Sequence, residues 1–203
     1  MPSATSLSWL DLKSSMVDVT VVIPTIPQRR SFLKDATDSV DYQTVQPSEV
    51  MIVEDTDGIG APAIRNKAAK RAKTEWLLFL DDDDWLYPRF IEKTYEHVNE
   101  ADVVLAWPAL EGAPQRPSLW KTYDPSVLDS FCPWGQCALV RRDSFLAVGG
   151  QRGGIRYEDW DLWRRMRDNG AKFFTVEERL WVHRIHPGQR TIQDGLNGLP
   201  DIL

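Results

Sequence analysis

The sequence predicts a single-domain α/β fold in which helices flank a central, mostly parallel sheet. Three observations lead to this prediction. Short β-branched and apolar runs alternate with segments of helical periodicity over the first half of the chain, as in βαβ units. These runs contain few alternating polar residues, which is typical of strands covered on both faces of a parallel sheet. The length of 203 residues fits one domain with a substantial core.

Strands are expected where an apolar run stops at a polar or turn-forming residue. Val17–Thr25 is β-branched and stops after Pro24, which has no N–H to donate to a sheet ladder. Glu49–Glu54 and Trp76–Leu80 are each followed by carboxylates, and Val103–Trp107 is followed by a proline-rich segment. These four runs are the predicted core of the sheet.

Helices are expected in the segments where apolar residues recur at intervals of three and four. The predicted helices span residues 28–42, 61–74, 88–99 and 157–168. The first three lie between predicted strands, so they serve as the crossovers that parallel strands require.

The chain changes character after residue 107. Prolines accumulate over residues 108–135, so loops are expected there. A short strand is predicted at 137–140, and two closing strands are predicted at 172–176 and 180–183.

Composition and charge exclude several classes of protein. Apolar residues make up 42% and charged residues 27%, which is usual for a globular chain and excludes a wholly disordered one. The formal net charge of −6 argues against a protein that binds mainly a nucleic-acid backbone. No apolar stretch reaches the ~18 residues of a transmembrane helix, and the first residues lack the pattern of a secretory signal. We therefore expect a cytoplasmic protein with Cys132 and Cys137 as free thiols, a local disulfide or metal role being the alternative.

Four adjacent aspartates, Asp81–Asp84, follow the strand predicted at Trp76–Leu80. Adjacent carboxylates raise one another's pKa unless a cation lies among them. Ligands of open α/β sheets bind at the carboxyl ends of the strands, and hard oxygen ligands suit Mg²⁺ or Mn²⁺. The run therefore predicts a metal site that binds a diphosphate, with a solvated acidic turn as the alternative.

Two nearby segments contain further candidate binding residues. Glu54 and Asp55 end a predicted strand, where a carboxylate can accept hydrogen bonds from a base or a ribose; an ordinary Asp-Gly turn is the alternative. Gly60 precedes a predicted helix with Arg65 and Asn66 in its first turns, close to where phosphates bind. Ordinary helix capping with a surface arginine is the alternative for this segment.

The second half of the chain contains two more candidate clusters. Glu158 and Asp159 precede the apolar face of a predicted helix, and one of them can serve as a base in a pocket with indoles nearby. Acidic residues also suit helix N-termini through the dipole alone. Glycines within 149–154 predict a mobile loop before this helix. His183 and His186 follow a predicted strand and could complete a metal or diphosphate site.

Taken in chain order, these segments resemble the family 2 glycosyltransferases with the GT-A fold. The matching pieces read VTVVIPT, VEDTDG, FLDDDDW, RRDSFLAVGG, YEDWDLW and VHRIHPGQ, with the segment 60–66 among them. They cover about residues 17–190, nearly the whole chain. Where relatives often read Asp-Asp-Gly-Ser, this chain reads Glu-Asp-Thr-Asp at 54–57, so the aspartate that contacts the nucleobase is retained as Asp55 while its neighbours differ.

The resemblance implies an inverting transfer from a nucleotide-diphosphate sugar, most often a UDP-sugar, with Mn²⁺ or Mg²⁺ as cofactor. Asp159 is the implied general base, and Glu158 is its acidic partner. The implied metal ligands are Asp83 and Asp81, with His186 touching the metal or the diphosphate. The implied donor-binding residues are Pro24, Thr25, Glu54, Asp55, Arg65, Asp81, Asp82 and Asp84.

The acceptor side is less well defined by the sequence. Trp134, Trp160 and Trp163 offer flat apolar surfaces on which a sugar can stack, and core packing is the alternative for each. The acceptor class stays open among a saccharide, a glycan, a protein and a modified base, including a phage enzyme that glycosylates virion protein or modified DNA. A monomer and a homodimer are both compatible with the sequence.

The expected organisation is a GT-A domain over residues 17–190, with a polar leader at 1–16 and a tail at 191–203. Residues 17–107 form the expected nucleotide-sugar half, and residues 108–190 form the expected acceptor and base half. Two other functions stay open. A nucleotidyltransferase usually needs a glycine-rich loop after its first strand, which this chain lacks. A non-catalytic nucleotide-sugar-binding module would not need Asp159.

Overall fold

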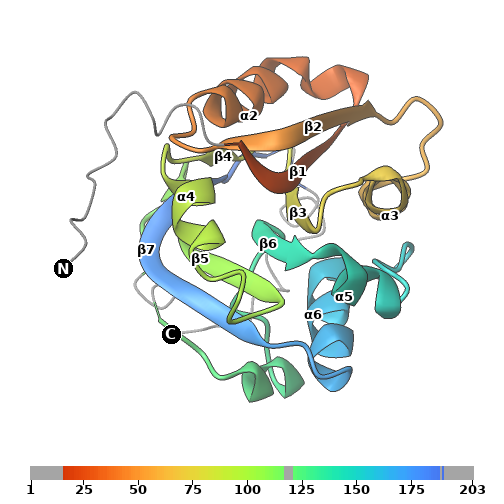
Figure 1. Cartoon of the computed structure of the whole chain (residues 1–203). Helices are drawn as coiled ribbons and strands as arrows, with labels where there is room; N and C mark the ends of the chain where they lie inside the picture. The colour runs from red at the N-terminus through yellow and green to blue at the C-terminus, as the bar shows by residue number, and fades with distance from the viewer. Residues whose placement is uncertain (1–15, 117–120, 188, 190–203) are drawn as a thin grey trace.

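A seven-stranded sheet forms the centre of the computed structural model, which describes residues 16–116, 121–187 and 189 (Figure 1). The strands are β1 Met16–Thr25, β2 Gln46–Glu54, β3 Trp76–Phe79, β4 Trp85–Leu86, β5 Val103–Glu111, β6 Ala138–Arg141 and β7 Phe173–Arg184. The helices are α2 Arg30–Asp41, α3 Ala61–Arg71, α4 Phe90–Tyr95, α5 Arg142–Ala147 and α6 Glu158–Asp168, with short 3₁₀ turns η1 Pro27–Arg29 and η3 Pro125–Asp129.

The sheet is mixed, with most of its strands running in one direction. The strand order is β2-β1-β3-β6-β5-β7-β4. Strand β1 pairs in parallel with β2 and β3, and β5 pairs in parallel with β7. Strand β6 runs antiparallel between β3 and β5, and β4 runs antiparallel to β7. Five of the seven described strands therefore share a direction, which confirms the predicted α/β class and adds two antiparallel strands to it.

Strand β1 is apolar along its length because its two faces enter two different cores. Val19, Val21 and Ile23 pack in one cluster, where α2 and α4 cover the sheet. Val22 points the other way, into a cluster with α3, α5 and α6. Figure 1 shows these two groups of helices on opposite sides of the sheet. Burial on both faces explains the near-continuous apolar run from which the strand was predicted.

The two closing strands expected at 172–176 and 180–183 are one continuous strand, β7. Its parallel partner β5 pairs Ala106 with Val176 and then Trp107 with Arg179, so the residues between Val176 and Arg179 bulge out of register. This stretch holds the exposed Glu177, whose polarity in the sequence resembles a loop. A β-bulge accommodates such extra residues without ending the strand.

Several other elements also differ from the sequence prediction. Strand β5 continues to Glu111, through Pro108, which lies beside a register irregularity where a missing N–H is tolerated. Helix α4 covers only Phe90–Tyr95 of the expected 88–99. Helix α5 was not predicted, because it follows β6 directly without an intervening turn signal.

The expected leader at 1–16, apart from Met16 in β1, and the expected tail at 191–203 lie outside the described residues. Among the helices that the structure describes, none has the length and apolar character needed to cross a membrane.

Candidate functional site

A cleft of about 320 Å³ opens at the carboxyl ends of β1, β2 and β3. These ends lie side by side because Thr25 of β1 pairs with Glu54 of β2, and Leu80 after β3 donates its N–H to Val22 of β1 at 3.1 Å. The cleft is lined by Pro24, Thr25, Ile26, Arg29, Asp55, Gly60, Ala61, Ile64, Arg65, Asp81, Asp82, Asp83, Glu158, His183 and Gln189. Most of the residues predicted to bind a donor therefore share one cleft.

The first two aspartates of the run are held by groups from β1, η1 and α3. The guanidinium of Arg65, which is only 3% exposed, forms an ion pair with Asp81. Asp82 accepts a hydrogen bond from the hydroxyl of Thr25 at 2.7 Å and another from Nη1 of Arg29 at 3.1 Å. Burial raises the pKa of Asp82, against the opposing effect of Thr25 and Arg29.

The last two aspartates are held by groups from η1 and from β7 and the residues after it. Asp83 accepts a hydrogen bond from Nη1 of Arg29 at 2.9 Å and lies 3.1 Å from Nε2 of His186. Asp84 lies 3.2 Å from Nδ1 of His183 and accepts the backbone N–H of Arg184 at 3.0 Å. Six cationic or hydrogen-bonding partners thus offset the repulsion that the four adjacent carboxylates create: Arg65, Thr25, Arg29, His186, His183 and the N–H of Arg184.

The donor set at this edge fits a hard divalent cation. Asp81, Asp83 and Asp84 each offer an oxygen, and these atoms lie within 4.8 Å of one another. Carboxylate oxygens are the ligands that Mg²⁺ and Mn²⁺ prefer. Asp82 is not part of this group, since its two oxygens face Thr25 and Arg29.

Asp84, one of the residues expected to bind the donor, lies behind the cleft and not in its wall. It is 3% exposed, it does not line the cleft, and its carboxylate faces His183 and the backbone of Arg184. Burial raises the pKa of Asp84 to about 6, although His183 opposes this effect. The position of Asp84 fits a structural role, because it joins the metal edge, the aspartate run Asp81–Asp84, to His183 and Arg184 of β7.

Asp55 caps the turn that leads from β2 into α3. Its carboxylate accepts the backbone N–H groups of Ile59 at 3.0 Å and Gly60 at 2.7 Å. The Gly60 bond, followed by that of Ile59, holds the pKa of Asp55 below its usual value, so the side chain stays ionised in the cleft. Glu54 pairs with Arg30 on the exposed side of the strand and does not line the cleft.

Of the two carboxylates at the N-terminus of helix α6, one lies in the wall of the cleft and the other does not. Glu158 is 8% exposed and lines the cleft, whereas Asp159 lies outside the residues that line it. Asp159 accepts the backbone N–H of Trp160 at 2.8 Å. Burial raises the pKa of Asp159 to about 6, and the neighbouring Glu158 adds to this effect. A carboxylate with this pKa is well matched to proton transfer near neutral pH.

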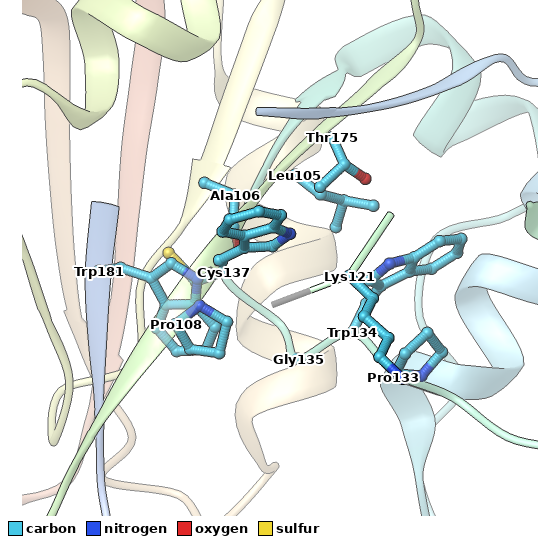
Figure 2. A pocket seen from close by; sticks show the side chains of 11 residues that line it. Leu105, Ala106, Pro108, Lys121, Pro133, Trp134, Gly135, Cys137, Thr175 and Trp181 are labelled. Atoms are coloured by element: carbon cyan, nitrogen blue, oxygen red, sulfur yellow. Dashed lines mark hydrogen bonds between the residues drawn. The ribbon is translucent and has the colours of Figure 1, made fainter. Parts of the chain in front are cut away.

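Two of the three tryptophans proposed for the acceptor side are core residues. Trp163 is fully buried, so no sugar can reach its ring. Trp134 is 9% exposed and stacks on Phe173 at 5.2 Å. The pocket beside Trp134, shown in Figure 2, has a volume of about 10 Å³, enough for one water molecule and far too small for a sugar ring.

Trp160 is the remaining candidate of the three. It is partly buried and donates its indole N–H to the carbonyl of Leu128 at 2.8 Å. For Trp163 and Trp134, core packing, the alternative left open by the sequence, is what the structure shows.

Arg29 and Gln151 are among the polar residues of the site that were not predicted from the sequence. Arg29 lies in the cleft and pairs with both Asp82 and Asp83. It follows the end of β1 by four positions, so the expectation that ligands bind at the carboxyl ends of strands, which pointed to the aspartates, also applies to Arg29. Gln151 accepts a hydrogen bond from Nη1 of Arg65 at 3.0 Å. Nothing local in the sequence marks Gln151, because its partner lies 86 positions away.

Comparison with known proteins agrees with this geometry. The family described as glycosyl transferase family 2 matches residues 58–131. An uncharacterized glycosyltransferase of Methanocaldococcus jannaschii is 22% identical over 204 residues, which cover 82% of this chain and 70% of that protein.

Two solved structures have the same fold. Staphylococcus aureus TarS 1-349 in complex with UDP-GlcNAc is 16% identical with a TM-score of 0.69, over 84% of this chain and 59% of that one. The mannosyltransferase PcManGT from Pyrobaculum calidifontis, in complex with GDP-Man and Mn²⁺, is 15% identical with a TM-score of 0.66, over 89% of this chain and 61% of that one. The chain thus spans about 60% of these structures. With its motifs in order and its fold matched, the chain is similar to the family 2 glycosyltransferases and has their GT-A fold.

Proposed function

We propose that this protein transfers a sugar from a nucleotide-diphosphate sugar to an acceptor hydroxyl, with inversion at the anomeric carbon and with a divalent cation. The observation that carries the proposal is the meeting of Asp81, Asp83 and Asp84 at the edge of the cleft that Thr25 and Arg65 line. A diphosphate needs cationic partners, and this edge offers both a hard-metal donor set and arginine side chains.

A UDP-sugar is the proposed donor. Asp55 lies in the cleft with its carboxylate held ionised by backbone N–H groups, so it can accept the N–H of a uracil ring. TarS has been solved with UDP-GlcNAc, and PcManGT with GDP-Man and Mn²⁺, which supports a nucleotide-sugar in a cleft of this fold. Of the Glu-Asp-Thr-Asp turn at 54–57, Asp55 is the residue that lines the cleft.

Asp81 and Asp83, with Asp84 beside them, are the proposed ligands of Mn²⁺ or Mg²⁺, and His186, which contacts Asp83, is proposed to touch the metal or the diphosphate. The cation supplies charge stabilisation for the departing nucleoside diphosphate. Arg65, buried against Asp81, adds a fixed positive charge at the same edge.

Asp159 is the proposed general base. At neutral pH a carboxyl group with a pKa of about 6 is mostly ionised, so it can take the proton of the acceptor hydroxyl as the oxygen attacks. Attack from the face opposite the leaving diphosphate inverts the anomeric centre in one step. One carboxylate therefore suffices, and Glu158 at the wall of the cleft serves as its acidic neighbour.

The acceptor is proposed only as a hydroxyl-bearing molecule. Trp160, next to Asp159 in helix α6, is the proposed contact on this side. A saccharide, a glycan, a protein side chain and a modified base all satisfy the chemistry.

The test is nucleotide release from UDP-, GDP- and dTDP-sugars in the presence of Mn²⁺, with EDTA as the matched control. We expect slow release from one donor without acceptor and none with EDTA. Pyrophosphate release from a nucleoside triphosphate would instead identify a nucleotidyltransferase. Binding of a nucleotide-sugar without turnover on any acceptor would identify a binding module.

A further inference from the structure

Gln151 is a buried amide that connects the two halves of the site. It is 3% exposed and lies in the segment between α5 and α6. Its Oε1 atom accepts a hydrogen bond from Nη1 of Arg65 at 3.0 Å, and its Nε2 atom donates to Oε1 of Gln136. Because both ends of the amide are bonded, its orientation is fixed.

The backbone of Gln151 is held by the residue that follows Arg65 in α3. Asn66 donates its side-chain N–H to the carbonyl of Gln151 at 2.7 Å and accepts the backbone N–H of Gln151 at 2.8 Å. Gly150 makes this approach possible, since it has φ +71° and a Cβ there would lie 2.2 Å from Oδ1 of Asn66. Two consecutive residues of α3 thus bind Gln151: Arg65 contacts its side chain, and Asn66 contacts its backbone.

Arg65 depends on this contact for its direction. Its guanidinium has two described side-chain partners, Asp81 and Gln151, while its Nε atom is buried without one among the described residues. A planar guanidinium held at both terminal nitrogens cannot rotate away from the cleft. Because Gln151 is neutral, it orients Arg65 without cancelling its charge.

We propose that Gln151 is a positioning residue, which directs the guanidinium of Arg65 toward Asp81 and the diphosphate of the donor. This inference rests on the proposed function, since it concerns the same donor cleft. It extends the donor site to the segment that leads into Glu158 and Asp159.

Two variants of Gln151 distinguish the loss of its hydrogen bond to Arg65 from a change of charge beside Arg65. Gln151→Met keeps the shape of the side chain and removes the bond to Arg65, so we expect UDP to bind about tenfold more weakly in the presence of Mn²⁺. Gln151→Glu adds a carboxylate that competes with Asp81 for Arg65, so binding weakens further. The buried Nε2 of Gln136 has no partner, and it can turn to donate to the new carboxylate and preserve folding.

Gln43→Met is the matched control. Gln43 is 4% exposed, and its amide donates to the carbonyls of Ser39 at 3.0 Å and Tyr87 at 2.8 Å. Its replacement removes buried hydrogen bonds away from the cleft, so thermal stability falls while the affinity for UDP stays at the wild-type value.

The measurement is calorimetric titration of UDP and of GDP, with Mn²⁺, into the wild type, these variants and a double-mutant cycle with Arg65→Ala. If Gln151 acts through Arg65, Gln151→Met has no further effect in the Arg65→Ala background. The inference is overturned if the losses of UDP affinity caused by Gln151→Met and Arg65→Ala are independent and add in the double variant. It is also overturned if Gln151→Met, like Gln43→Met, lowers thermal stability and leaves the affinity for UDP unchanged. A wild-type protein that binds neither nucleotide contradicts the proposed function itself.

Discussion

Nδ1 of His183, on β7, lies 3.2 Å from a carboxylate oxygen of Asp84, which follows β3 and stands 99 positions earlier in the chain. Although burial alone lowers the pKa of His183, Asp84, with Asp83 and Asp81 behind it, raises it to about 9. The histidine is therefore protonated at neutral pH and neutralises one carboxylate of the metal edge. This ion pair connects the end of β7 to the aspartates that follow β3.

This pair predicts a loss of stability in mild alkali. The folded-state pKa of His183, about 9, lies above the ordinary histidine value of 6.5, so its contribution to stability is fully present below pH 6.5 and is lost as the pH rises through 9. The side chain of His183 is 39% exposed, so solvent screening limits the effect to about 1 kcal/mol. Melting temperatures in EDTA from pH 6 to 10 should fall more in the wild type than in His183→Gln. A parallel pH dependence in the two proteins would contradict the pairing, and His97→Gln, a histidine that contacts Glu100, is the control.

Asp83→Asn should abolish stabilisation by Mn²⁺. The substitution keeps the shape of the side chain but removes one charge from the three-carboxylate donor set. A ligand that binds only the folded state stabilises it by about 2.7 kcal/mol at 100 times its Kd. We expect Mn²⁺ to raise the melting temperature of the wild type and of Asp38→Asn, whose carboxylate pairs with Lys34 on the surface, but not of Asp83→Asn. An equal response in all three proteins would place the metal elsewhere.

With saturating Mn²⁺ to keep the metal-binding carboxylates ionised, the transfer rate should depend on the ionisation of Asp159 near pH 6. Burial, with a further effect of Glu158, raises the pKa of Asp159 to about 6, and only the ionised carboxylate can act as a base. We therefore expect kcat/KM at saturating Mn²⁺ to rise about tenfold per pH unit below pH 6 and to level off above it. The profile is measured from pH 4.5 to 8. A flat profile over this range would argue against Asp159 as the base.

Gly150→Ala should destabilise the protein more than Gly170→Ala does. Both glycines have positive φ, +71° and +86°, so both substitutions incur the cost of a left-handed alanine, about 1 kcal/mol. At Gly150 the new Cβ also meets Oδ1 of Asn66 at 2.2 Å, whereas at Gly170 nothing lies within 4 Å. Urea unfolding of the two variants gives the difference, which we expect to exceed 1 kcal/mol, on the order of a lost buried hydrogen bond. Equal destabilisation would mean that the Asn66 contact contributes little.

The strand–helix alternation and the location of the site could be predicted because both depend on local patterns. The apolar runs at 17–25 and 76–80 mark strands buried on both faces, and Asp81–Asp84 lie at a strand end, where the topology places ligands. The continuity of β7 could not be predicted, because a polar bulge at Glu177 is indistinguishable from a loop until its partner β5 is known.

The side chains that contact the aspartates could not be predicted from local sequence patterns either. His183 and Asp84 lie 99 positions apart, and His186 and Asp83 lie 103 apart, so no spacing rule connects them. For Trp163 the sequence left two interpretations open, a stacking surface for a sugar and core packing. Its full burial in the structure supports core packing.

The most direct test of the account is single-turnover transfer by Asp159→Asn, with the donor that the wild type uses and Mn²⁺ present. We expect the chemical step to slow by about 10²–10⁴-fold, with nucleotide affinity unchanged, because Asp159 takes a proton and does not line the donor cleft. Asp161→Asn, in the same helix and paired with Arg165, should transfer at the wild-type rate. An Asp159→Asn protein that transfers sugar within a fewfold of the wild-type rate would contradict the central claim.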